Sequence, residues 1–199
     1  MGTLRDIVQN HLLQVVALLA MEPPVAADPD ALRDETTKVL RAMRPLDLAD
    51  VVRGQYRGYR NEEGVAEDSR METFVALRAW VDSWRWAGVP FYLRAGKHLA
   101  TNATEVQVEF QRHPRLLFAG DDAPPPHPNH LVFSLQPGEK VSLGVQVKRP
   151  GEGLATRPAA LVYAYDEARD GRRDSAYTHL IADALVDRDG GWHCPVVAS

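Results

Sequence analysis

The chain has 199 residues, of which 45% are hydrophobic and 25% are charged, as in an ordinary globular protein rather than a disordered one. Lysine and arginine number 23 against 27 aspartate and glutamate, and the resulting net charge of -4 argues against a nucleic-acid-binding protein. The one cysteine, Cys194, excludes an internal disulfide and a cysteine-based metal site. No apolar run approaches the roughly 20 residues of a membrane span, and the first residues do not resemble a signal peptide. We therefore expect a cytoplasmic protein without a membrane segment.

Two helices are predicted in the first 45 residues. Residues 4–20 carry apolar side chains at helical spacing, and their second half is apolar all round, which indicates a buried helix. A proline pair shortly afterwards ends it. Asp28 followed by Pro29 is typical of an N-cap and a first helical residue, so a second helix is expected over about 30–43.

The next part of the chain predicts a mixture of elements. Residues 51–59 indicate a strand or extended loop, and residues 60–70 indicate a polar, mobile surface loop. Residues 71–85 have helical spacing and predict a third, amphipathic helix, which the Gly-Val-Pro segment at 88–90 would end. A short strand is expected over 91–94. The aromatic side chains of this region are expected to pack in the core and on the sheet: Trp80, Trp84, Trp86, Phe91 and Tyr92.

Beyond residue 100 the hydrophobic period changes to two. Alternating apolar and polar residues are typical of half-buried strands in a mostly antiparallel sheet, and they occur over 106–110, 131–136, 141–147 and 161–165. A proline-rich loop is expected over 121–129, and residues 175–187 return to helical spacing. Helices followed by strands and a further helix predict an α+β fold, with a large, mostly antiparallel sheet and helices packed on one of its faces.

The first predicted helix contains a candidate acid–base site. It places Asp6 and His11 within two turns, and an imidazole can accept a proton from a hydroxyl near pH 7. On an ideal α-helix the two residues lie about 140° apart, so each would meet a ligand separately. The alternative is that His11 is a packed core histidine and that Asp6 belongs to a solvated helix start.

Two further candidates end predicted strands. Lys97 follows an arginine and a glycine, where its cation could meet an anion such as a phosphate; the alternative is a basic strand end in solvent. Gln136 precedes a Pro-Gly turn, and its amide could bind a sugar hydroxyl or simply flank the turn. His127 and His130 are weak evidence for a metal, so we expect no metal site. No glycine-rich phosphate loop of the usual kinds is present in the sequence.

Four segments of the sequence carry motifs of a known family. Residues 5–14 are RDIVQNHLLQ, residues 51–56 are VVRGQY, and ETF at 72–74 is followed by WAGVPFYLRAGK at 86–97. In this order they resemble the RD-x-x-QNHLLQ, V-x-GQY, ETF and RW-x-GVPF-x-LR-x-GK segments of glucose-6-phosphate dehydrogenases. The likeness extends from about residue 4 to residue 187.

The resemblance implies an enzyme of the oxidative pentose phosphate pathway that oxidises the C1 hydroxyl of glucose 6-phosphate to the lactone and passes the hydride to NADP. It implies that His11 is the general base for the hydroxyl proton and Asp6 a sugar-binding carboxylate. Lys97 matches a substrate-binding lysine, and Gln136 a further residue on the substrate side. The matching region is the family's C-terminal domain, whose antiparallel sheet makes the dimer contact, so a homo-oligomer is expected.

The sequence also departs from the family pattern. The motifs of the family's N-terminal Rossmann domain are missing, and so is its DHYLGKE-type segment, which supplies the carboxylate that orients the base. Asn102 stands where some members have a basic residue. We expect a C-terminal-like domain over 1–187 and a divergent tail over 188–199.

These departures lead us to expect negligible dehydrogenase activity from the chain alone. Two alternatives remain open at this point. The chain could be a non-catalytic module that binds a sugar phosphate or pairs with a full-length homologue through its sheet, or it could be a degraded gene fragment.

Overall fold

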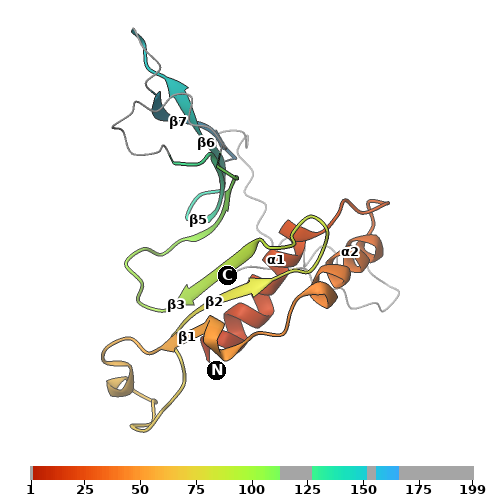
Figure 1. Ribbon diagram of the computed structural model, residues 1–199. Helices are drawn as coiled ribbons and strands as arrows, with labels where there is room; N and C mark the ends of the chain where they lie inside the picture. The colour runs from red at the N-terminus through yellow and green to blue at the C-terminus, as the bar shows by residue number, and fades with distance from the viewer. Residues whose placement is uncertain (1, 113–126, 152–155, 166–199) are drawn as a thin grey trace, which may run out of the picture. The chain divides into compact units, whose positions relative to one another are not determined.

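A computed structural model describes residues 2–112, 127–151 and 156–165 of the chain (Figure 1). The chain divides into two compact units, one extending to Leu99 and the other beginning at Ala100, and each is described by itself. The predicted helix over 175–187 and the tail over 188–199 lie outside the described residues, as does most of the proline-rich loop. The domain boundary at residue 187 therefore stays a prediction.

Both predicted N-terminal helices are confirmed. The first consists of a π-helical part, η1 (Leu4–Leu12), and an α-helical part, α1 (Leu13–Ala20). The second, α2 (Pro29–Ala42), begins at the predicted cap, because the Asp28 carboxylate accepts hydrogen bonds from the next two free amides of the helix. None of the described helices is both long and apolar enough to cross a membrane.

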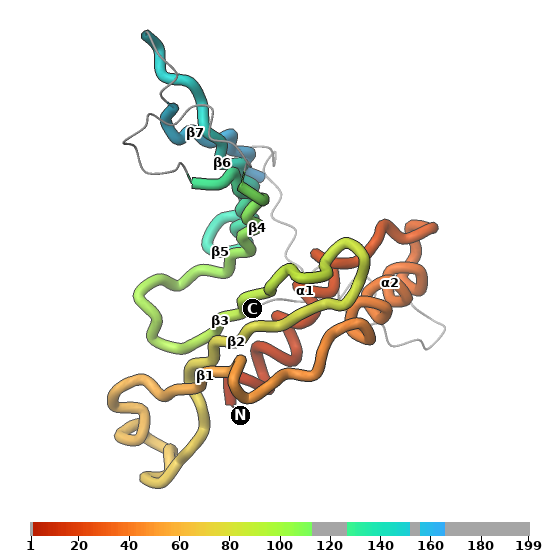
Figure 2. The backbone as a smooth tube through the Cα atoms, in the orientation of Figure 1, coloured from red at the N-terminus to blue at the C-terminus, as the bar shows by residue number. Residues whose placement is uncertain are grey.

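Three strands form the antiparallel sheet of the first unit, in the order β1-β2-β3: Val51–Gly54, Phe74–Trp80 and Pro90–Gly96. Single 3₁₀ turns precede and follow β1, at Leu48–Asp50 (η2) and Tyr59–Asn61 (η3). Of residues 51–59, predicted as a strand or extended loop, 51–54 form strand β1 and the rest a loop and turn. The strand prediction for 91–94 is confirmed, and a loop occupies most of 60–70 as predicted. Figure 2 shows how β2 and β3 run antiparallel beside the first helix.

The predicted helix over 71–85 is wrong, because residues 74–80 form strand β2. Burial alternates along this strand: Val75 and Leu77 are buried against the helices, whereas Arg78 is exposed on the other face. The outer face also carries half-buried apolar residues, such as Phe74 and Trp80. Apolar residues on both faces satisfy helical spacing as well as strand spacing, so periodicity alone could not separate the two structures.

A single hydrophobic core lies between the helices and one face of the three-stranded sheet. Its buried side chains come from η1, α1 and α2 and from the β2 and β3 segments, and at the centre Val75 has 0% and Ala17 has 1% of its surface exposed. Trp86 packs against Phe91, with 5.2 Å between ring centroids, and its indole N–H donates to the carbonyl of Ala20. The indole therefore both covers the core and satisfies a free carbonyl at the end of α1.

Two of the aromatic predictions are wrong. Trp84 is fully exposed in the β2–β3 connection, and Tyr92 is 76% exposed on the outer face of β3. Tyr92 alternates with buried Phe91 and Leu93, so the strand's period of two directs it away from the helices.

The second unit is built on a four-stranded antiparallel sheet in the order β4-β5-β6-β7: Thr104–Glu109, His130–Gln136, Lys140–Lys148 and Thr156–Ala164. All four predicted strands are confirmed. The register aligns Val108, Leu131, Leu143 and Leu161 across the sheet, so one face is apolar. The α+β fold class is thus confirmed, with the described strands divided between two sheets.

The alternating burial of β2 leads to a prediction of stability. Leu77 is 4% exposed at the centre of β2, so Leu77→Ala is expected to lower the free energy of unfolding by about 2–5 kcal/mol. The matched change Leu48→Ala removes a leucine that is 83% exposed and is expected to cost less than about 0.5 kcal/mol. Denaturant unfolding followed by tryptophan fluorescence measures both; equal losses in the two variants would contradict the burial of Leu77 in the core.

Candidate functional site

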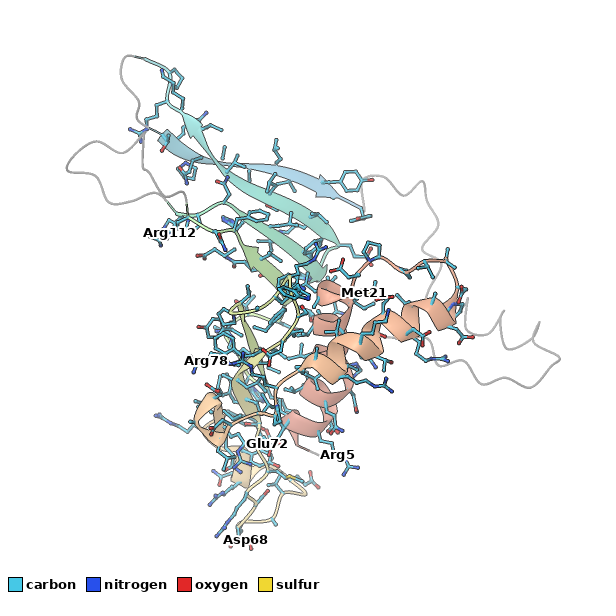
Figure 3. The ribbon with its side chains drawn as sticks, turned by 45° about the vertical axis from the view of Figure 1, so that its right-hand side comes forward. Arg5, Met21, Asp68, Glu72, Arg78 and Arg112 are labelled. Carbon is cyan, nitrogen blue, oxygen red and sulfur yellow. The ribbon has the colours of Figure 1, made fainter. Side chains whose placement is uncertain are left out.

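The helix that carries Asp6 and His11 is fixed at its start by a residue far along the chain. Its N-cap position, Thr3, makes no side-chain cap of its own. Instead, the Glu72 carboxylate accepts a hydrogen bond from the Leu4 amide at 3.0 Å. Both the amide and the hydroxyl of Thr3 donate to the Glu72 carbonyl at 3.2 Å. Figure 3 places Glu72 beside this end of the helix, near Arg5.

The π-helical geometry of η1 changes the relation between the two candidate residues. In a π-helix each carbonyl bonds to the amide five residues later, and the Leu13 amide indeed donates to the carbonyl of Val8. Residues five apart, such as Asp6 and His11, therefore lie about one turn apart along the same side of the helix. The angle of about 140° expected for an α-helix is wrong here. Both residues are half-buried.

Lys97 follows directly after strand β3 and is exposed. Its amide donates to the Thr73 carbonyl at 2.9 Å, which fixes the backbone at the strand end. Gly96 makes this approach possible, because a Cβ at that position would come within 2.8 Å of the Phe74 ring. Since η1 packs against β3, Asp6, His11 and Lys97 all belong to neighbouring elements of the same unit.

Gln136, the fourth predicted residue, ends strand β5 in the second unit. It is exposed, pairs with Thr104 across the ladder and precedes a cis peptide bond to Pro137. A hollow of about 320 Å³ adjoins this turn. In its lining, the hydroxyl of the buried Ser134 donates to the Glu105 carboxylate at 3.2 Å. The role of Gln136 in binding the same substrate as Asp6, His11 and Lys97 stays a prediction.

An aromatic and acidic cluster adjoins Lys97 in sequence. The ring of His98, which has a positive φ of 54°, lies 4.3 Å from that of Tyr56 between centroids. The Tyr56 hydroxyl donates to the Glu62 carboxylate, and this hydrogen bond raises the pKa of Tyr56 to about 12. The carboxylate also lies 3.9 Å from the His98 imidazole. The cluster joins the loop after β1 to the residue next to Lys97.

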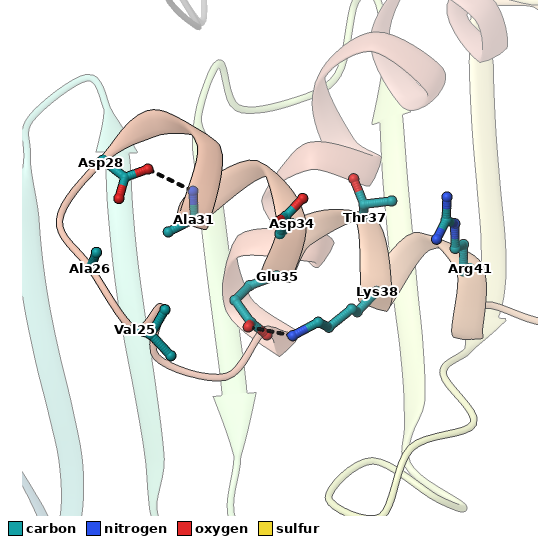
Figure 4. A pocket seen from close by; sticks show the side chains of 9 residues that line it. All are labelled: Val25, Ala26, Asp28, Ala31, Asp34, Glu35, Thr37, Lys38 and Arg41. Carbon is teal, nitrogen blue, oxygen red and sulfur yellow. Dashed lines mark hydrogen bonds and ion pairs between the residues drawn. The ribbon is translucent and has the colours of Figure 1, made fainter.

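Another hollow, of about 450 Å³, opens along α2 (Figure 4). Part of its polar lining is engaged within the structure: Asp28 caps the helix, and Glu35 forms an ion pair with Lys38. Within residues 2–112, 127–151 and 156–165, no three His, Cys, Asp or Glu side chains gather closely enough to hold a metal ion. The three predicted site residues of the first unit lie on η1, which carries Asp6 and His11, and directly after β3, where Lys97 follows.

Comparison with known proteins identifies the family of the chain. Residues 1–192 match the family described as glucose-6-phosphate dehydrogenase, C-terminal domain. The chain belongs to this family. The glucose-6-phosphate 1-dehydrogenase of Mycolicibacterium smegmatis is 43% identical over 92% of the chain, and that of Bacillus subtilis is 41% identical over 93% of it.

Solved structures of the family share the fold. A glucose-6-phosphate dehydrogenase in complex with its substrate glucose-6-phosphate superimposes with a TM-score of 0.82 at 39% identity, over 92% of this chain and 39% of that one. The Mycobacterium avium enzyme has a TM-score of 0.74 at 46% identity, over 82% of this chain and 35% of its own. The chain spans about 40% of the length of the two curated relatives.

The Tyr56–Glu62 hydrogen bond predicts a pH dependence. The folded pKa of Tyr56, about 12, lies above the ordinary value of 10, so the bond stabilises the fold below pH 10, and this stabilisation is lost as the pH rises towards 12. Glu62→Gln removes the charge and is expected to return the Tyr56 pKa towards 10, as followed by NMR titration of its ring carbons. Glu63→Gln, a change at an exposed neighbour, serves as the control. The same pKa of Tyr56 in all three proteins would contradict the conclusion that the hydrogen bond to Glu62 raises it.

Proposed function

We propose that this chain forms the substrate-binding part of a glucose-6-phosphate dehydrogenase and binds glucose 6-phosphate around η1 and the end of β3. The observation that supports this most directly is that Asp6 and His11 lie along one side of a helix that packs against the strand leading to Lys97. A carboxylate, an imidazole and an ammonium group suit a ligand with hydroxyls at one end and a phosphate at the other.

Each side chain has a separate task in the proposed reaction. The Lys97 ammonium pairs with an anionic oxygen of the phosphate and orients the sugar. The Asp6 carboxylate accepts a hydrogen bond from a sugar hydroxyl. His11 would accept the proton of the C1 hydroxyl. The hydrogen that leaves C1 with its two electrons would go as hydride to NADP, the acceptor that the family resemblance implies.

The family resemblance implies NADP as the hydride acceptor. Every strand pair in the described part of the chain is antiparallel. A dinucleotide fold instead places a glycine-rich turn between a parallel strand and a helix. The antiparallel strands of the described residues do not fit a dinucleotide site of this kind. We also propose a cytoplasmic location, which the family resemblance supports.

The proposal predicts that glucose 6-phosphate binds the purified chain and that binding depends on charge. Lys97→Met and Asp6→Asn are each expected to weaken the affinity by about 10- to 100-fold, the value of a hydrogen bond to a charged group. Lys140→Met, at an exposed lysine of the second unit, is the matched control and should leave the affinity unchanged. Isothermal calorimetry measures all four proteins. An affinity insensitive to both site variants would contradict the proposal.

A second candidate function, pairing through the four-stranded sheet, is favoured by the apolar face of the second unit. Strand β7 leaves Leu161 67% and Tyr163 55% exposed on the same face. Exposed apolar side chains aligned on one face are typical of protein interfaces. The partner would be a second copy of the chain or a full-length homologue, as the family's dimer contact implies.

Leu161→Arg tests the pairing. It is expected to convert a dimer to a monomer in analytical ultracentrifugation and to prevent co-purification with a full-length homologue, because a buried guanidinium without a partner is costly. Leu48→Arg, at a leucine 83% exposed in the first unit, is the matched control and should leave association unchanged. Unchanged association in the Leu161→Arg variant would contradict pairing through this face.

A further inference from the structure

We infer that Glu72 and Thr73 are a pair of positioning residues that hold the helix bearing Asp6 and His11 in a fixed relation to Lys97. Two consecutive residues bond to three separate backbone segments: the start of η1, the end of β1 and the end of β3. The identity of the ligand that the positioned groups bind rests on the proposed function. The positioning itself rests only on the hydrogen bonds of Glu72 and Thr73.

Glu72 acts on the helix. Its carboxylate accepts from the Leu4 amide and its carbonyl accepts from Thr3, which is 4% exposed. A free amide at a buried helix start costs about 1–3 kcal/mol when it lacks a partner, and a carboxylate there also interacts favourably with the positive end of the helix dipole. Gly2 permits the close approach, since a Cβ at that position would overlap the Glu72 carboxylate.

Thr73 acts on the strands. It is 3% exposed, and every polar group it carries is bonded at 2.9 Å. Its amide donates to the Gly54 carbonyl and its carbonyl accepts from the Lys97 amide, while its hydroxyl accepts from the Tyr56 amide. The backbone entering Lys97 is thus fixed by the residue adjacent to the helix cap.

The covalent link between the two residues makes the arrangement rigid. One peptide bond separates the carboxylate cap of η1 from the carbonyl that receives Lys97, so the helix start and the strand end share a single short connection. Loss of the cap frees the first turn of η1, in which Asp6 lies, to fray. A site that must meet a sugar and a phosphate together loses affinity when its two ends move independently.

The experiment compares Glu72→Leu, which removes the acceptor, with Glu72→Gln, which retains an oxygen at the same position. Thr73→Val and Thr73→Ser form a second such pair in case Glu72→Leu does not fold. Glu67→Leu, at an exposed glutamate of the preceding loop, is the control. The readouts are amide hydrogen exchange at Leu4 and Tyr56, the NMR signals of His11 and Lys97, and calorimetric affinity for glucose 6-phosphate.

We expect Glu72→Leu to accelerate exchange at Leu4 at least about tenfold, to shift the signals of both His11 and Lys97, and to weaken glucose 6-phosphate binding about tenfold. Glu72→Gln should retain most of each property, and Thr73→Val should act in the same direction, with faster exchange at Tyr56. If Glu72 only stabilised the fold locally, the affinity for glucose 6-phosphate in Glu72→Gln would not return towards that of the unmodified chain.

The outcomes separate this inference from the proposed function. Unmoved Lys97 and His11 signals in both Glu72→Leu and Thr73→Val would overturn the positioning, whether or not the sugar phosphate binds. Wild-type affinity in Glu72→Leu would overturn it as well, while leaving the proposed function intact. Failure of the unmodified chain to bind glucose 6-phosphate, with the signals of His11 and Lys97 shifted in the variants, would overturn the proposed function and support the positioning.

Discussion

The first unit depends on the burial of one helical face against one face of a three-stranded sheet. Ala17 and Val81 are each 1% exposed and Val75 is fully buried, so small side chains let the helix and strands approach closely. This packing fixes which side of the helix remains available to a ligand. Polar groups that meet a substrate can then sit at the border of the core, where packed neighbours hold them in place.

At the border of that core, side chains form hydrogen bonds with the backbone groups at the helix ends that have no partner within the helix. The indole of Trp86 satisfies the carbonyl of Ala20 at the end of α1, and the Glu72 carboxylate satisfies the Leu4 amide at the start of η1. Both ends of one long helix are therefore capped by distant residues that flank strand β2 in the sequence, Glu72 before it and Trp86 after it. Such caps stabilise the fold and also specify where the helix begins and ends.

The second unit follows a different physical principle. Its four strands largely follow a period of two, so the register places most of the valine, leucine and aromatic side chains on one face and polar ones such as Glu105 and Gln107 on the other. On β7 the apolar face stays largely exposed, as Leu161 and Tyr163 show. A sheet of this composition is suited to contact with another surface, whereas the first unit is suited to hold polar groups at a site.

The sequence by itself determined the α+β class, both N-terminal helices, the Asp28 cap, the four alternating strands and the family, because these features are encoded in local spacing and motifs. Only the tertiary structure decided that residues 74–80 are a strand. Their apolar residues fit both the helical period and the strand period, and packing against the helices selects the strand. The tertiary structure also decided the π-helical turn of η1 and the bond between Glu72 and Leu4, which lie 68 residues apart. No local pattern specifies a partner at that separation, because the packing of helix on sheet brings the two together.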